Sequence, residues 1–195
     1  MSDERPTSAV DGPVLEALAA DTAREVTGYL DAVTEVASGN QSDTALPVLL
    51  LALSQILTTG ARLGAIQDVL PDEKFEPDVG PDPDVDAVRN GLANLLEGLD
   101  EYADVVDPLT SVEVTRGSLT NDLTEVATAL WHGLRHHQAG RTTEALWWWQ
   151  FSYLSSWGER AASALRVLLS VLGHLRLDAD DEVVAEAQFE ALHTT

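Results

Sequence analysis

Two histidines on one predicted helix form the pattern in this sequence that most resembles a metal site. His132 and His136 are four residues apart, so a helix places both on one face, and Glu125 lies on the same stripe two turns earlier. Such a pair holds zinc when a carboxylate from a neighbouring helix completes the tetrahedron. The pair lacks the adjoining glutamate of the metalloprotease motif. Solvated histidines near a helix C-terminus, where positive charge is stabilised, are therefore the simpler interpretation.

A cluster of tryptophans is the second notable feature. The stretch EALWWWQFSYLSSWGERA, residues 144–161, contains four of the chain's five tryptophans. On an uninterrupted helical wheel, Trp147, Phe151 and Leu154 fall on the apolar side and are predicted to be core. Trp149 lies at the margin of that side and is predicted to be partly buried. Trp148 falls on the opposite side, in a polar setting formed by Glu144, Ser152, Ser155, Glu159 and Arg166.

The position of Trp148 has two interpretations. In the first, another element packs over this side and buries the indole, because a helix that is apolar all round is usually central in its bundle. In the second, the indole is exposed within a polar ring, which is the composition of a binding hot spot. Glu144, Glu159 and Arg166 would then orient a partner. Arg141, in the preceding turn, either joins a carboxylate in fixing that turn or binds an anion.

The charge of the chain limits its partners. Thirty-three aspartates and glutamates against 11 lysines and arginines give a formal net charge of −22. Binding to a phosphate backbone draws on clustered cations, so direct nucleic-acid binding is not expected. The acidity indicates either a solubilising surface or an acidic face made for a basic protein partner or for imitating nucleic acid.

Several classes of protein are not expected from this sequence. It has no cysteine, and hence no disulfide or thiolate. The longest apolar run, residues 45–57, is shorter than the roughly 20 residues of a bilayer span, which predicts a core helix and no membrane partner. The N-terminus lacks the pattern of a secretory signal, so the cytoplasm is the expected location. No phosphate loop, nucleophile elbow or dinucleotide fingerprint occurs, so we expect neither a cofactor nor an enzyme.

Helical periodicity predicts an all-α fold, an antiparallel bundle of five to six helices in a single domain. Residues 1–11 are predicted to be a flexible tail and residues 12–192 the helical domain, with no strand. The third helix is expected over about 84–105, and the fifth, from 141 to 177, is expected to kink at Gly158. Residues 71–86 hold five prolines and glycines and seven carboxylates, which predicts an acidic loop.

Three stretches resemble a known bacterial family, the domain of unknown function 5063. They are LPDEKFEPDVGPDPDVD, EYADVVDP and GRTTEALWWWQFSYLSSWGERAASALRVL, and the resemblance runs from about residue 21 to 177. It implies a single helical domain with no established activity, cofactor or catalytic residue, so it transfers no site. The resemblance also implies a link to DNA recombination and repair, near whose genes family members are encoded.

The sequence thus predicts a non-enzymatic protein–protein interaction or regulatory module. The expected binding surface is the face around Trp148, the acidic loop 71–86, or both. One alternative is a protein that binds a metal or small ligand through His132 and His136 with Glu125. The other is an acidic nucleic-acid mimic.

Overall fold

The computed structural model describes residues 12–40, 42–71, 80–106 and 109–177, and these are mostly helical. The helices are α1 (Gly12–Ala37), α2 (Ala45–Ala65), α3 (Asp86–Leu95), α4 (Leu119–Gln138), α5 (Thr142–Ser152) and α6 (Gly158–Leu177), with a short 3-10 turn η1 (Ser42–Thr44) before α2. A π-helical segment, η2 (Tyr153–Trp157), joins α5 to α6. Strands β1 (Glu101–Val105) and β2 (Val114–Ser118) form an antiparallel hairpin. The predicted tail 1–11, residues 72–79 of the acidic loop and residues 178–192 of the predicted helical domain lie outside the described residues.

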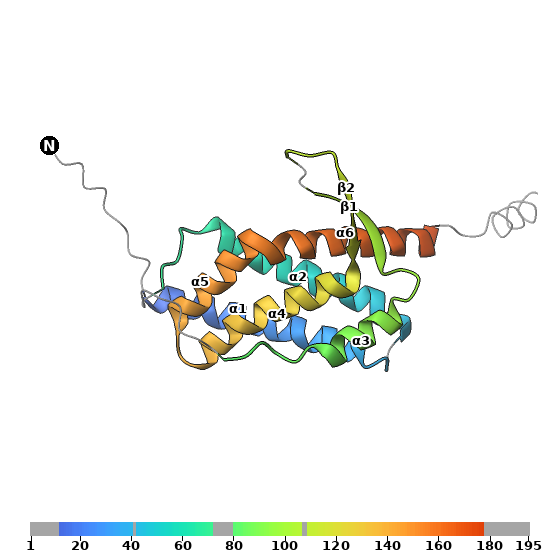
Figure 1. Ribbon diagram of the computed structural model, residues 1–195. Coiled ribbons are helices and arrows are strands. Elements are labelled where there is room, and N and C mark those ends of the chain that lie inside the picture. The colour runs from blue at the N-terminus through green and yellow to red at the C-terminus, as the bar shows by residue number, and fades with distance from the viewer. Residues whose placement is uncertain (1–11, 41, 72–79, 107–108, 178–195) are drawn as a thin grey trace, which may run out of the picture.

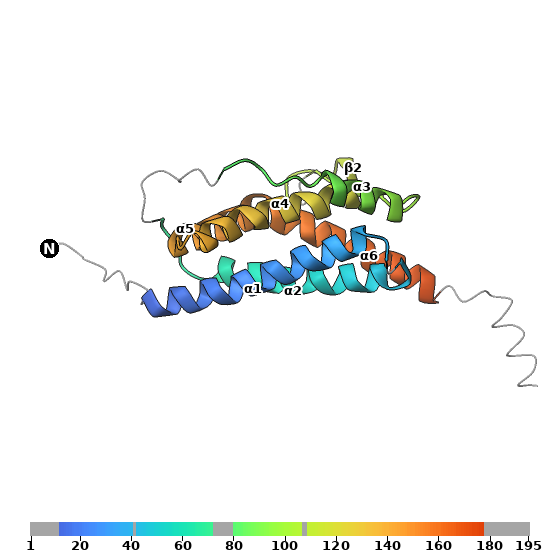
Figure 2. The same ribbon diagram turned by 90° about the horizontal axis from the view of Figure 1, so that it is seen from below.

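The helices form two layers around one apolar core (Figures 1 and 2). One layer holds α1 and α2, and the other holds α4 and the long helix α5–η2–α6, while α3 packs on α1 and α4 at one end. Among the described helices only α2 is long and apolar enough to cross a membrane. Here α2 packs against α1 and α6 and buries Leu49, Leu53, Ile56 and Leu63, as predicted for a core helix.

The predicted helical fold is confirmed, but the expected course of its third helix is wrong. Helix α3 ends at Leu95, and residues 101–105, predicted as its last turns, form β1 instead. Gly98 has a positive φ of 81°, a conformation that reverses the chain and that glycine adopts without strain. Residues 101–105 then pair with residues 114–118, so strand pairing, and not local helix periodicity, determines the structure of this segment.

The π-helical segment shifts the buried face of the long helix. With residue 147 at 0°, the buried residues of α5 centre at about 190° and those of α6 at about 310° on a continuous α-helical wheel. The two directions differ by about 120°. Each residue of an α-helix turns the chain by about 100°, so the one extra residue of a π-turn accounts for most of this difference. A single helical wheel drawn over both α5 and α6 therefore assigns the wrong side of α5 to the core.

This shift reverses the predicted burial of the tryptophan cluster. Trp149 and Trp157 are fully buried, whereas Phe151 is 53% and Leu154 63% exposed, and Trp147 is only half-buried. The prediction of core positions is wrong for Phe151 and Leu154, whereas Trp147 packs against the edge of the core. The kink expected at Gly158 corresponds to the π-turn that ends immediately before it.

Close approach to α2 at Gly60 accommodates the π-turn. A β-carbon at Gly60 would lie 2.4 Å from Tyr153 Cδ2 and 2.6 Å from Trp157 Cη2, well inside van der Waals contact. The two rings pack against each other, with centroids 4.9 Å apart, and fill the space that the missing side chain leaves.

We expect Gly60→Ala to destabilise the protein by about 1–3 kcal/mol, because the methyl group overlaps two rings that the core holds in place. The measurement is the free energy of unfolding in urea. Gly28→Ala is the matched control: Gly28 is an exposed glycine inside α1, a β-carbon there would have no neighbour within 4 Å, and this substitution should stabilise by about 0.5–1 kcal/mol. Equal effects of the two substitutions would contradict the packing described here.

Candidate interaction site at the hairpin arm

Trp148 is half-buried against α4 and its indole N–H is bonded. Trp148 Nε1 donates to the carbonyl of Ala129 at 2.7 Å, and the next indole, Trp149, donates to the carbonyl of Leu130 at 3.0 Å. The His132 ring lies 5.2 Å from the Trp148 ring, and Asp82, from the acidic loop, lies 3.0 Å from His132 Nε2. The packing interpretation of Trp148 therefore describes this structure better than the hot-spot interpretation.

The three residues of the predicted metal site lie in different environments. His136 is fully buried, His132 faces Trp148 and Asp82, and Glu125 is exposed. Within the described ranges no group of three or more histidines, cysteines or carboxylates is placed to hold a metal ion. The spacing does put both histidines on α4, but helix packing directs one ring into the core and leaves the other at its edge.

The remaining predicted partner-binding residues separate into two places. Glu144, which is buried, and Arg141, which is partly exposed, line a cleft of about 400 Å³ between the start of α5 and the first turn of α1. Glu159 and Arg166 line another cleft, of about 490 Å³, between α6 and the hairpin. The structure thus brings together two pairs of the predicted residues and leaves Trp148 in neither.

The hairpin, here termed the arm and described over residues 101–106 and 109–118, is tied at its base to α4. Ser118 caps α4 by accepting from the Asn121 N–H at 3.2 Å, and its hydroxyl donates to Asp100 Oδ2 at 2.8 Å. Asp100 Oδ1 accepts from the Thr120 N–H at 2.7 Å. Although partial burial opposes ionisation, the hydrogen bonds from Thr120 and Ser118 hold the pKa of Asp100 below its usual value. The arm therefore begins and ends at one capped helix terminus.

Tyr102 anchors the arm to the bundle through a buried carboxylate. Its hydroxyl donates to Asp122 Oδ2 at 2.5 Å, and Arg160 Nη1 donates to Asp122 Oδ1 at 3.1 Å. Burial raises the pKa of Asp122 even though both partners favour its charged form, and burial together with the Asp122 charge raises the pKa of Tyr102. Asp122 is only 5% exposed, so this arrangement is an anchor rather than an acid–base pair open to a substrate.

Gly117 makes room for that anchor. Tyr102 and Gly117 are paired across the hairpin, and a β-carbon at Gly117 would lie 2.2 Å from Tyr102 Cζ. The tyrosine ring therefore lies across the neighbouring strand on its way to Asp122, and no larger residue fits at that position.

Helix α6 covers the outer edge of β1 but not that of β2. Arg166 Nη2 donates to the Ala103 carbonyl at 3.4 Å and to Asp104 Oδ1 at 3.1 Å. The Val106 N–H donates to the Glu113 carbonyl, and the Leu119 N–H donates to the Asp100 carbonyl. In an antiparallel ladder, hydrogen-bonded and non-hydrogen-bonded pairs alternate, so Val114 and Arg116 stand in non-hydrogen-bonded pairs. Their backbone N–H and C=O groups therefore face away from β1. In the part of the chain that the structure describes, no backbone hydrogen bond reaches this edge of β2.

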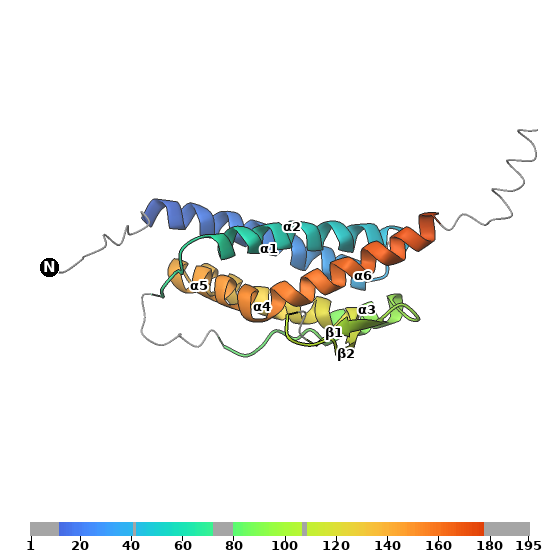
Figure 3. The ribbon, with the colours of Figure 1, turned by 90° about the horizontal axis from the view of Figure 1, so that it is seen from above.

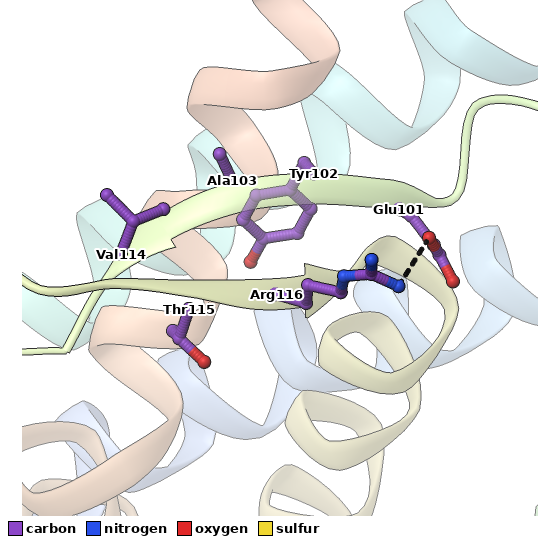
Figure 4. A pocket seen from close by; sticks show the side chains of 6 residues that line it. All are labelled: Glu101, Tyr102, Ala103, Val114, Thr115 and Arg116. Atoms are coloured by element: carbon purple, nitrogen blue, oxygen red, sulfur yellow. Dashed lines mark ion pairs between the residues drawn. The ribbon is translucent and has the colours of Figure 1, made fainter.

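The arm also exposes several aliphatic side chains. It projects from the bundle (Figure 1), with Val106 53%, Val114 65% and Val112 96% exposed. Figure 4 shows a shallow hollow on the arm lined by Glu101, Tyr102, Ala103, Val114, Thr115 and Arg116, where Glu101 and Arg116 form an ion pair at 3.7 Å. An isolated two-stranded hairpin is marginally stable in water, and an uncovered aliphatic edge is a template for pairing with another chain.

The sequence carries a signal for this arm that helix periodicity obscured. The runs YADVV and SVEVT are rich in valine and lie on either side of Asp107 and Pro108, the residue types that favour a turn between two strands. The tethering residues Asp100, Tyr102 and Asp122 have no local signal, because the contacts among them join segments 20 residues apart.

Comparisons with known proteins give a family and a fold. Residues 13–174 match the family model described as domain of unknown function (DUF5063). The chain is similar to the crystal structure of protein BF1032 from Bacteroides fragilis, with a TM-score of 0.58 and 16% sequence identity over 80% of this chain and 89% of that chain. No curated protein matches the chain. At this identity the structural similarity establishes the fold alone.

Removing the Tyr102 hydroxyl should loosen the arm. In Tyr102→Phe, Asp122 keeps only Arg160 as a side-chain partner, so we expect a loss of about 1–3 kcal/mol in the free energy of unfolding. Urea denaturation measures it, and Thr115→Ala, at an exposed position on the same arm, should change it by less than about 0.5 kcal/mol. If Tyr102→Phe is as stable as Thr115→Ala, Tyr102 does not anchor the arm.

Alkaline pH should destabilise the protein through two tyrosines. Burial raises the pKa of Tyr29, whose hydroxyl donates to the Leu123 carbonyl at 3.1 Å, and burial and Asp122 raise that of Tyr102. The unfolded chain loses these protons near pH 10, before the folded chain does. Their stabilisation is therefore complete below about pH 10 and falls as pH rises further, by up to about 1.4 kcal/mol per pH unit for Tyr29.

Urea midpoints measured from pH 8 to 11.5 test this dependence. A Tyr29→Phe and Tyr102→Phe double variant should show a flatter profile than the wild type. Identical profiles would show that neither hydroxyl titrates differently in the folded chain.

Proposed function

The chain belongs to the domain of unknown function 5063 family, and we propose that it is a non-enzymatic interaction module that binds an extended, basic segment of a partner protein along its arm. The observation that carries this proposal is the open outer edge of β2. Outward-facing backbone groups at Val114 and Arg116 complement another extended strand, and strand addition of this kind is a recurrent mode of peptide recognition.

The exposed valines supply the apolar part of this surface. Val105 and Val114 are a cross-strand pair on the outward face, and Val112, two residues before Val114, extends this face toward the tip. Side chains at alternate positions of an added strand would contact this face, while its backbone pairs with β2. Binding would bury aliphatic surface that the free protein exposes to water.

Charge supports a basic partner. The sequence from 101 to 118 has four carboxylates, Glu101, Asp104, Asp107 and Glu113, against a single arginine, Arg116, and the whole chain has a net charge of −22. A field of this sign accelerates encounter with a basic segment and repels acidic ones. Basic extended segments are typical of proteins that bind nucleic acid. We propose a protein of this class as the partner, in keeping with a role in DNA recombination and repair.

Two substitutions at Arg116 separate backbone pairing from the side chain. Both Arg116→Pro and Arg116→Ala remove the guanidinium group, but only proline removes the outward N–H, and it does so without breaking a bond of the hairpin ladder. Peptides selected on the wild-type protein from a random 12-residue library are the probe. We expect them to combine β-branched residues with lysine or arginine and to bind Arg116→Pro at least ten-fold more weakly than Arg116→Ala.

Circular dichroism establishes that both variants are folded, and fluorescence anisotropy measures the peptide affinities. Binding should weaken as salt rises, because ions screen the attraction between opposite charges. Peptides that bind the two variants equally, or that perturb residues of the bundle rather than those of β2 in NMR spectra, would refute strand addition at this edge.

A further inference from the structure

A second apolar surface runs along the groove between α2 and the long helix, on the side opposite to the buried core. On the long helix it consists of Phe151, Leu154 and Leu169, each more than half exposed, with half-buried Trp147, Leu165 and Leu172 between and beside them. On α2 it consists of half-buried Leu46, Leu50 and Leu57. We term these nine residues the leucine stripe.

The two halves of the leucine stripe adjoin. Helices α2 and α6 lie side by side (Figure 3), and a β-carbon at Gly64 of α2 would lie 3.4 Å from Leu154 Cδ2. At one end, the rings of Trp147 and Phe151 stack with their centroids 5.4 Å apart and their planes 10° from parallel. The π-turn creates this surface, because it turns the apolar side of α5 away from the core.

Acidic side chains avoid the leucine stripe. Helix α2 contains no aspartate or glutamate, and residues 142–177 contain two glutamates, of which Glu144 is buried and Glu159 faces the arm. With Arg62, Arg160, Arg166 and Arg176, these two segments carry a net charge of +2. The rest of a chain whose total is −22 therefore carries −24. Carboxylates are thus sparse on this helix pair and concentrated in the rest of the chain.

We propose that a second copy of this chain docks on the leucine stripe, giving a two-fold symmetric dimer. Two chains of charge −22 repel each other wherever carboxylates meet, and the leucine stripe is the surface on which the described residues place none. A two-fold contact sets the leucine stripe against itself, so apolar side chains meet apolar side chains. An anionic membrane is the weaker fit, because the remaining charge of −24 opposes approach to it.

The size of the surface suits a dimer. From Trp147 to Leu172 the helix extends about 38 Å, and two adjacent helices are about 20 Å wide, which gives a face of about 760 Å². A standard protein interface buries about 800 Å² on each partner. This inference is independent of the proposed function, since the arm and the leucine stripe share no residue.

Sedimentation velocity of the full chain tests the dimer. We expect a species of twice the 21.0 kDa chain mass, with an association that strengthens from 0.1 to 0.5 M NaCl because salt screens the repulsion between like charges. Phe151→Asp and Leu169→Asp, both at exposed positions, should each weaken association at least ten-fold. Val112→Asp, at an exposed position on the arm, is the matched control and should leave it unchanged.

Three results would overturn the proposal. The first is a wild-type monomer up to 0.2 mM in 0.5 M NaCl, and the second is undiminished association of folded Phe151→Asp and Leu169→Asp variants. The third is co-sedimentation of the wild type, but not of these variants, with phosphatidylcholine and phosphatidylglycerol vesicles, which would make the leucine stripe a lipid-binding face. If one variant does not fold, the other decides. Peptide binding weakens with salt whereas dimerisation strengthens, so failure of either proposal leaves the other measurable.

Discussion

The packing of Tyr153 and Trp157 over Gly60 is the constraint on which the arrangement of the second layer depends. These rings fit against α2 because the long helix takes one extra residue in a π-turn there. The extra residue rotates α5 relative to α6, so that Trp149 enters the core and its indole N–H meets a carbonyl of α4. The same rotation exposes Phe151 and Leu154. One local change in helix winding therefore determines both what the core contains and what the surface presents.

The arm depends on a different kind of interaction. Its apolar side chains face outward, so burial does not hold it in place, and polar contacts do so instead. Asp100 and Ser118 close its base, while Tyr102 and Arg160 meet at the buried Asp122. A buried carboxylate with two charge-assisted partners is directional, because each bond requires a particular geometry. The bundle thus presents a rigidly attached strand edge whose own side chains remain available for contact.

The two proposed surfaces differ in a way that follows from charge. The arm lies in the acidic majority of the chain and offers backbone hydrogen bonds, which suits a basic extended segment. The leucine stripe lies on helices whose net charge is +2 and offers side chains only, which suits another apolar helical face. Salt acts on the two in opposite directions, because ions screen attraction at one surface and repulsion at the other. A dimer formed through the leucine stripe would leave both arms outside the interface.

Composition and periodicity by themselves determined that this chain is a helical domain with the apolar segment of α2 in its core, because apolar spacing reports burial within one helix. They also singled out Glu159 and Arg166, two of the residues beside the arm. Valine-rich runs on either side of Asp107 and Pro108 are typical of strands, but only the tertiary structure showed that β1 and β2 pair, since strand pairing joins segments that local periodicity treats separately. The tertiary structure alone decided which tryptophans are buried, because a π-turn changes the phase of a helix without a distinctive local sequence. The partners of Asp122 were likewise beyond sequence, since three distant segments meet there only after folding.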